Sequence, residues 1–167
     1  MRHMVRCLNV LASIGLFLGF ATATGFAANP HCYEVGGAIL TNVGGFGVID
    51  EQPTTLGVAT GDLKGAIGVV ILNDSTPSIF HVQHHWVTEN GETLFVDPAY
   101  AHGTFVNNPP SLFAITDYKV HLSGGTGRFA GATGDMKAIG EIDLVSGQLV
   151  LRYSGQICEV PTKARQE

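Results

Sequence analysis

The densest group of titratable side chains in this chain is the run His81-Val-Gln-His-His85, which is followed directly by Trp86. On an extended strand, successive side chains point to opposite faces, so His84 and Trp86 share one face while His81 and His85 share the other. Imidazoles grouped in this way are typical of two kinds of chemistry, which are metal coordination and proton transfer near neutral pH.

A metal site would join His81 and His85 to a third ligand, for which the candidates by residue type are His31, His102 and His121. Residues four apart on a strand are separated by about 13 Å, because each residue advances the strand by about 3.3 Å. One zinc ion cannot be held by two ligands at that separation. The spacing therefore argues against a metal shared by His81 and His85 unless the strand is broken, and no metal or other cofactor is expected in the protein.

Proton transfer would use the other face of the same strand. The sequence Glu89-Asn-Gly-Glu92 predicts a hairpin with a two-residue turn, which would place His84 opposite Asp97. A carboxylate beside an imidazole orients the ring and raises its pKa, as in general acid–base pairs. His84 and Asp97 are therefore the candidate catalytic residues, although an ordinary polar contact between neighbouring strands explains the same pair. The sequence places no nucleophile beside them.

The histidines and Asp97 must be positioned by β-strands, because the residues after 30 show almost no helical periodicity. Nineteen of the 22 glycines follow residue 28, and valine, isoleucine, threonine and aromatic residues separate them, which is typical of an all-β protein. The predicted strands cover residues 33–40, 46–49, 56–60, 63–72, 79–88, 93–97, 113–122, 135–144 and 148–157. The proline-containing segment 107–110 is predicted to be a loop.

A second hairpin is predicted around Val145-Ser-Gly-Gln148, with a two-residue turn that pairs Ile142 with Leu151 and Glu141 with Arg152. Its alternation predicts one face in the core and one face in water. The residues of the expected core face are Met136, Ala138, Gly140, Ile142, Leu144, Leu149, Leu151, Tyr153 and Ile157.

The first 28 residues have the order of a secretory signal peptide. Arg2, His3 and Arg6 precede an apolar run over residues 10–20, and small residues follow up to Ala28. Its removal would take away two arginines and change the net charge from −5 to −7. The remaining cations are dispersed, so nucleic acid is not an expected partner. The predicted organisation is a signal peptide over 1–28, one domain over 29–160 and a tail over 161–167, in a secreted or periplasmic protein with no membrane span after cleavage.

Two cysteines remain after the signal peptide, Cys32 and Cys158, one near each end of the domain. An even pair in an exported chain predicts a disulfide. It would close nearly the whole domain, which in the chain-entropy model stabilises the fold by about 4–5 kcal/mol. The first and last strands of a closed barrel are neighbours, so this pairing favours a barrel. Two free thiols or a metal-binding pair are the alternatives.

A glycine-rich corner, Ser123-Gly-Gly-Thr-Gly-Arg-Phe-Ala-Gly-Ala-Thr-Gly134, joins two of the predicted strands. A dinucleotide fingerprint would need a helix after the last glycines, whereas residues 135–144 alternate with the period of a strand. The stretch resembles the corresponding turn of allene oxide cyclase-like and dirigent-like β-barrels, including secreted bacterial proteins of that pattern. Strand number, cysteines and resemblance together predict a small closed antiparallel β-barrel of about eight strands, with a β-sandwich as the alternative.

The resemblance implies a function as well as a fold. Proteins of this kind bind an apolar reactive molecule in the barrel and guide its cyclisation or isomerisation, and the corner supplies none of their catalytic residues. The expected ligand-binding walls are Trp86, Phe95, Tyr118 and Tyr153. The alternative function is a non-enzymatic exported protein, for binding or structure, whose barrel is filled by side chains. A hydrolase or metalloenzyme built around His84 is the third reading.

Overall fold

The computed structural model describes residues 30–49, 52–72, 74–106 and 111–161, with the backbone alone for residues 43–49. The predicted signal peptide, the loop at 107–110 and all but the first residue of the predicted tail lie outside these residues. Within the described part of the chain, no helix has the length and apolar character needed to cross a membrane.

Nine strands and two short 3-10 helices make up the fold. The strands are β1 (His31–Ile49), β2 (Gln52–Ala59), β3 (Gly65–Ile71), β4 (Ile79–Thr88), β5 (Thr93–Val96), β6 (Ala99–Phe105), β7 (Leu112–Gly125), β8 (Thr133–Asp143) and β9 (Gln148–Glu159). The 3-10 helix η1 (Gly61–Leu63) precedes β3, and η2 (Gly127–Phe129) lies in the corner between β7 and β8.

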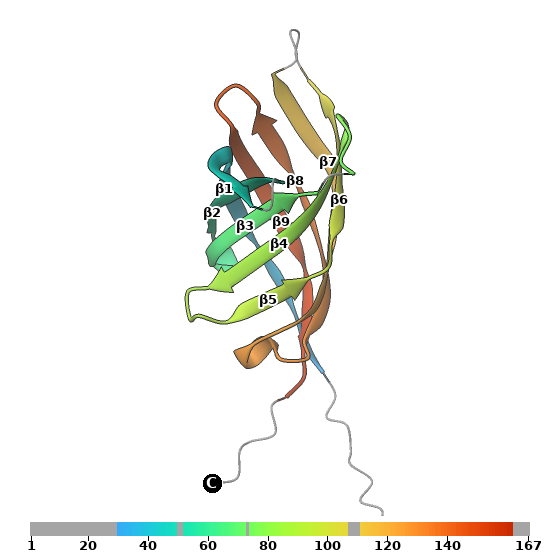
Figure 1. Ribbon diagram of the computed structural model, residues 1–167. Helices are drawn as coiled ribbons and strands as arrows, with labels where there is room; N and C mark the ends of the chain where they lie inside the picture. Colours follow the sequence, from blue (N-terminus) through green and yellow to red (C-terminus); the bar gives the residue numbers. More distant parts are fainter. Residues whose placement is uncertain (1–29, 50–51, 73, 107–110, 162–167) are drawn as a thin grey trace, which may run out of the picture.

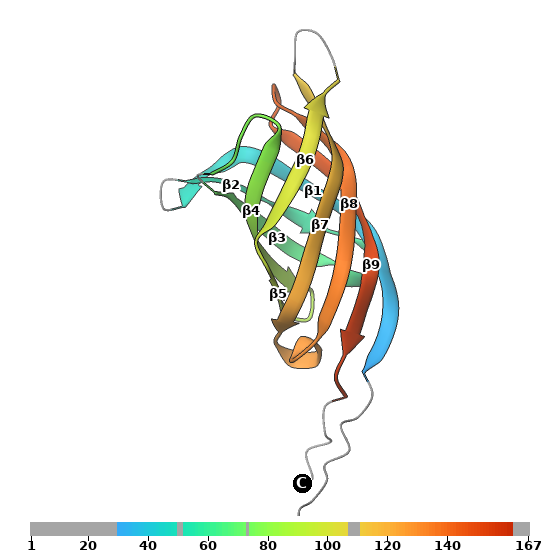
Figure 2. The same cartoon turned by 90° about the vertical axis from the view of Figure 1, so that its right-hand side faces the viewer.

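The nine strands form a closed antiparallel barrel with eight positions around the ring, because β5 and β6 share one position (Figures 1 and 2). Each of these two strands pairs with both β4 and β7, at successive positions along them. Asp97 and Pro98 separate these two strands, and proline has no N–H with which to continue a ladder. The predicted closed barrel is confirmed, and the alternative of a β-sandwich is wrong.

The largest differences from the predicted strands concern β1 and β6. The first two predicted strands form one continuous strand, β1, whose pairing with β2 shifts between Val43 and Val48. Strand β6 was not predicted, because its sequence Ala-Tyr-Ala-His-Gly-Thr-Phe contains two alanines and a glycine, which have low strand propensity. Its pairing with two long neighbours supplies the order that local propensity does not.

The predicted disulfide between Cys32 and Cys158 is confirmed. These residues are direct cross-strand partners on β1 and β9, which run side by side to the lower end of the barrel (Figure 2). The bond therefore ties together the first and last strands of the ring, which also pair along their length.

The glycine-rich corner closes the lower end of the barrel, where η2 lies in Figure 1. Gly127 has a φ of 59°, a left-handed conformation that favours glycine, and it lets the chain turn so that the Phe129 side chain enters the core with none of its surface exposed. Arg128 stacks on the Phe129 ring and its Nε lies 3.2 Å from Oε2 of Glu92. The corner therefore has a structural role.

Large side chains fill the lower half of the barrel. The Trp86 indole N–H donates a 2.8 Å hydrogen bond to the Leu63 carbonyl, and the Tyr153 hydroxyl donates to the Thr60 carbonyl at 2.8 Å. The Trp86 and Tyr153 rings meet edge to face. Other side chains with less than 2% of their surface exposed at this end are Leu63, Leu94, Leu122, Phe129 and Ile157. This half is a packed core.

In the β8–β9 hairpin, the buried residues of both strands lie on the predicted core face, but the two strands pair in a different register. Asp143 pairs with Gln148, so the turn contains four residues, 144–147, and Ile142 faces Leu149 where Leu151 was expected. Arg152 pairs with Ile139, and the predicted pairing with Glu141 is wrong. The register differs from the expected one by two residues, and a shift of two keeps every side chain on its own face. Met136, Ala138, Ile142, Leu151, Tyr153 and Ile157 are accordingly buried.

Candidate functional site

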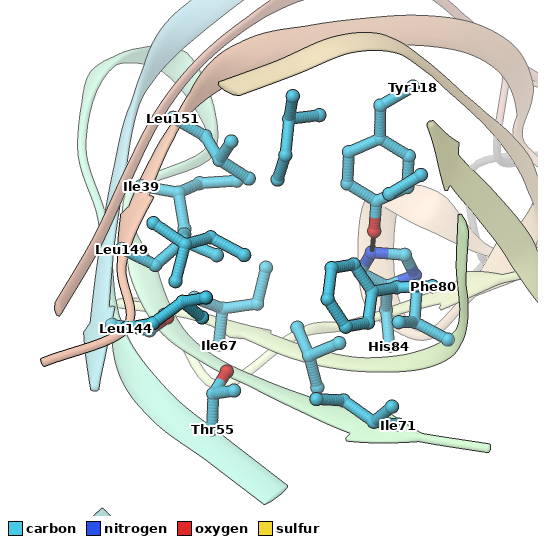
Figure 3. A pocket seen from close by; sticks show the side chains of 16 residues that line it. Ile39, Thr55, Ile67, Ile71, Phe80, His84, Tyr118, Leu144, Leu149 and Leu151 are labelled. Carbon is cyan, nitrogen blue, oxygen red and sulfur yellow. Dashed lines mark hydrogen bonds between the residues drawn. The ribbon is translucent and has the colours of Figure 1, made fainter. Parts of the chain in front are cut away.

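The upper half of the barrel contains a cavity of about 90 Å³, at the end that carries the β8–β9 turn (Figure 3). Side chains from β1, β2, β3, β4, β6, β7, β8 and β9 and from the β8–β9 turn surround it. They are Ile39, Thr41, Thr55, Ile67, Val69, Ile71, Phe80, Val82, His84, Ala101, Ile115, Tyr118, Ile142, Leu144, Leu149 and Leu151. Leu144, with 44% of its surface exposed, lies at the mouth of this cavity.

The wall of the cavity is divided by chemistry. Ile39, Leu149 and Leu151 lie together on one side of the hollow in Figure 3, whereas His84 and Tyr118 lie on the other. Apolar side chains make up most of the surface, so an apolar molecule would be drawn from water into this space.

A hydrogen bond joins the Tyr118 hydroxyl to Nε2 of His84, and both side chains are buried. His84 points inward because Val82, His84 and Trp86 alternate with outward residues along β4. Tyr118 points inward because β7 has a bulge between Ile115 and Tyr118, where its pairing with β8 shifts by one residue.

The bulge decides which side chain of β7 enters the cavity. Simple alternation from Phe113 through Ile115 would turn Asp117 inward, whereas Asp117 is exposed and Tyr118 is buried. The partner strand β6 shifts its register at the same level, between His102 and Gly103. The bulge therefore brings a phenol to His84 in place of a carboxylate.

The predicted pairing of His84 with Asp97 is wrong. Trp86 pairs with Leu94 and Val87 with Thr93, so the register differs by one residue from the expected one. The cause is the turn: the Thr88 N–H donates to the Glu92 carbonyl, which leaves a three-residue loop with Gly91 at a φ of 80°. Asp97 is exposed, and its backbone N–H donates to the His121 carbonyl on β7.

Burial decides the charge state of the pair. It lowers the pKa of His84 to about 4, with a smaller contribution from the neighbouring His85. Burial also raises the pKa of Tyr118 above its ordinary value. Both groups are therefore neutral near pH 7, and the pair is an uncharged phenol and imidazole.

Three buried polar atoms of the cavity lining have no hydrogen-bond partner among the described residues. They are Oγ1 of Thr41, Oγ1 of Thr55 and Nδ1 of His84. Buried polar groups in folded proteins nearly always have a partner. All three atoms lie around one cavity, so its mainly apolar wall also contains polar atoms that are free to form hydrogen bonds within the described part of the chain.

The predicted ligand-binding walls are distributed over three places. Tyr118 lines the upper cavity. Trp86 and Tyr153 lie below it, around a smaller space of about 20 Å³ that shares Ile39, His84 and Tyr118 with the upper cavity. Phe95 lies on the outer surface with 51% of its area exposed, so it lines neither space. The same one-residue shift of the hairpin explains its outward position.

The histidines of the opposite face lie outside the lumen. His81 Nδ1 is 2.7 Å from an oxygen of Asp74, and its ring stacks on Tyr100. His85 is exposed. Among the described residues, no group of three or more histidine, cysteine or acidic side chains is placed to hold a metal ion.

Sequence reasoning missed Thr41 and Thr55 as lining residues. Thr41 was outside the predicted strands and Thr55 preceded one, so neither had an assigned face. For Thr41 the signal is the alternation that continues from Val35 and Ile39 along β1. No comparable pattern points to Thr55.

No protein-family model and no curated protein matches the chain. Among solved structures, it is similar to the pterocarpan synthase dirigent protein GePTS1, with 13% identity over 90% of this chain and 100% of that chain and a TM-score of 0.41. It is also similar to the pterocarpan synthase dirigent protein PsPTS1, with 14% identity over 80% of this chain and 99% of that chain and a TM-score of 0.35. Similarity at this level gives no correspondence between site residues.

Proposed function

We propose that this protein binds a small, mainly apolar molecule in the upper cavity and guides its cyclisation or isomerisation. The observation that carries the proposal is an apolar cavity with a neutral imidazole–phenol pair in its wall. A closed apolar space holds a flexible molecule in few conformations, and this ordering lowers the entropic part of the barrier to an intramolecular reaction.

The His84–Tyr118 pair can exchange donor and acceptor roles without a change of net charge. In one tautomer the Tyr118 hydroxyl donates to His84 Nε2, and the phenol oxygen is free to accept a hydrogen bond from the ligand. In the other tautomer His84 Nε2–H donates to the phenol oxygen, and the Tyr118 O–H is free to donate. An isomerisation that moves a proton between two atoms of one molecule needs both roles in turn.

We further propose that the protein works outside the cytoplasm. Residues 1–28 have the pattern of a signal peptide, and the disulfide between Cys32 and Cys158 is of a kind that persists in oxidising compartments. The second candidate function, a non-enzymatic binding or structural protein with a filled barrel, is favoured by the packed lower half. The cavity of the upper half counts against it.

The test is extraction and mass spectrometry of the folded protein, purified from its native export route, with a variant that fills the cavity. Ala101 lines the cavity and Ala66 is exposed on the outer surface, so Ala101→Leu and Ala66→Leu form a matched pair. We expect one apolar compound per chain in the wild type and in Ala66→Leu, and none in Ala101→Leu. A wild-type protein that carries no compound and binds no apolar probe would favour the filled-barrel alternative.

A further inference from the structure

Two threonine hydroxyls in the same wall of the cavity have no hydrogen-bond partner among the residues that the structure describes. Thr41 on β1 has 5% of its surface exposed and Thr55 on β2 has 3%, and both Oγ1 atoms lack a hydrogen-bond partner within the described residues. Thr41 pairs with Gly57 and Thr55 with Val43, so the two threonines are diagonal neighbours on adjacent strands. Diagonal neighbours of this kind point the same way and are within reach of one bound group.

The hydroxyls lie apart from the imidazole–phenol pair. In Figure 3 the Thr55 oxygen points up into the hollow from its lower side, whereas Tyr118 enters from the upper right. A ligand that reached both would have one end at the threonines and its body beside His84 and Tyr118. The cavity therefore has two polar places separated by apolar side chains.

Charge is absent from the described lining. None of the 16 lining residues is Lys, Arg, Asp or Glu, and the lowered pKa of His84 keeps its imidazole neutral. A carboxylate or an ammonium group in this space would lose its hydration without meeting a counter-charge, which is strongly unfavourable. A hydroxyl or carbonyl group loses less hydration, and a threonine hydroxyl can replace it because it both donates and accepts.

From these observations we infer that the ligand is an uncharged molecule with an apolar body and one oxygen function, an alcohol or a ketone, which binds at the hydroxyls of Thr41 and Thr55. This inference rests on the proposed function, because it names the class of molecule that the same cavity receives. It excludes fatty acids and other carboxylates as ligands.

Three probes of similar shape test the inference by calorimetric titration of the disulfide-bonded exported protein: cyclohexanol, methylcyclohexane and cyclohexanecarboxylate. We expect cyclohexanol to bind about threefold to tenfold more tightly than methylcyclohexane, the effect of one hydrogen bond between neutral groups. We expect the carboxylate to bind more weakly than either.

The variants Thr41→Val and Thr55→Val, alone and combined, should remove the preference for cyclohexanol and leave the binding of methylcyclohexane in place. Thr55→Ser, which keeps the hydroxyl, should retain the preference. Thr54→Val is the matched control, because Thr54 is equally buried on the same strand while its hydroxyl already donates to the Gln52 carbonyl at 3.2 Å.

The outcomes separate this inference from the proposed function. Equal binding of cyclohexanol and methylcyclohexane, or a preference that survives the double valine variant, would overturn the inference and leave an apolar-ligand site standing. Tightest binding of the carboxylate would also overturn it. Failure of the wild type to bind any of the three, with no compound extracted from the native protein, would remove the proposed function itself.

Discussion

The Tyr118 hydroxyl on β7 is hydrogen-bonded to His84 Nε2 on β4, although β5 and β6 lie between these two strands in the barrel wall. The contact forms inside the lumen, where a bulge in β7 turns Tyr118 inward. It joins two neutral groups, and among the described residues neither side chain has another hydrogen-bond partner.

The first prediction concerns this hydrogen bond. Tyr118→Phe removes the phenol and leaves Nε2 of His84 buried without a partner, so the free energy of unfolding should fall by about 1–3 kcal/mol. Any isomerase or cyclase activity should be lost as well. Tyr100→Phe is the control, because Tyr100 is 49% exposed on the outer surface and its removal should change stability by less than about 0.5 kcal/mol. Urea denaturation measures the stability of both variants. Equal losses of stability in Tyr118→Phe and Tyr100→Phe would contradict the prediction.

The second prediction concerns pH. The pKa of His84 is lowered from 6.5 to about 4, mainly by burial. Between these values the unfolded chain binds a proton at His84 that the folded chain does not bind, so stability is full above pH 6.5 and falls as the pH decreases toward 4. The expected loss from this group is about 3 kcal/mol. The free energy of unfolding should be measured across this window.

His84→Gln isolates the contribution of His84 from that of the exposed histidines. The variant should be less stable than the wild type at neutral pH, because it disturbs the buried contact with Tyr118, and its stability should change less between about pH 7 and about pH 4. Parallel pH profiles of the wild type and His84→Gln would show that the buried imidazole does not titrate in this way.

The two hairpins show how far the sequence could predict the site. Both turns were expected to contain two residues. The β8–β9 turn contains four, and the resulting shift of two kept Ile142, Leu151 and Tyr153 on the core face. The β4–β5 turn contains three, and the resulting shift of one separated His84 from Asp97 and turned Phe95 outward. Strand faces follow from alternation, whereas register depends on turn geometry that side-chain pattern alone does not specify.

The barrel itself was predictable for a different reason. The prediction of a closed barrel rested on features that do not depend on the exact register of the strands. These features are the glycine-rich corner and the pairing of Cys32 with Cys158. The inward position of Tyr118 was harder to predict, because it depends on a bulge that long-range pairing with β6 and β8 accommodates. The orphan hydroxyls of Thr41 and Thr55 emerge only when all the surrounding strands are in place.

The third prediction concerns closure. Cys32→Ser with Cys158→Ser removes a bond that spans 126 residues of sequence, and the free energy of unfolding should fall by about 4–5 kcal/mol in the chain-entropy model. Reduction of the wild type should have the same effect, since Cys32 is exposed to reductant. Urea denaturation of the oxidised, reduced and serine forms measures the difference. An oxidised protein no more stable than the serine variant would contradict the prediction.

The fourth prediction compares the packed lower half of the barrel with its outer surface. Phe129→Ala opens a void in the packed lower half, where Phe129 is fully buried, and should cost about 3–5 kcal/mol of stability. Phe95→Ala is the matched change on the outer surface and should cost less than about 1 kcal/mol. Cyclohexanol binding should be the same in Phe95→Ala and the wild type. A large loss of probe binding in Phe95→Ala would place this residue at the site after all.

The fifth prediction concerns Thr54 and Thr55, adjacent residues of β2 at which replacement by valine should change stability in opposite directions. Thr55 buries a hydroxyl that has no partner in the described part of the chain, so Thr55→Val removes an unfavourable group and should raise the stability of the ligand-free protein by about 1–3 kcal/mol. Thr54 buries a hydroxyl that donates to the Gln52 carbonyl, so Thr54→Val should lower stability by about 1 kcal/mol. Thermal unfolding with and without cyclohexanol distinguishes the two, because the ligand stabilises the wild type and Thr54→Val more than Thr55→Val. A loss of stability in Thr55→Val without ligand would mean that the Thr55 hydroxyl already has the partner that we assign to the ligand. A gain in Thr54→Val would contradict the stabilising role of the hydrogen bond from Thr54 to the Gln52 carbonyl.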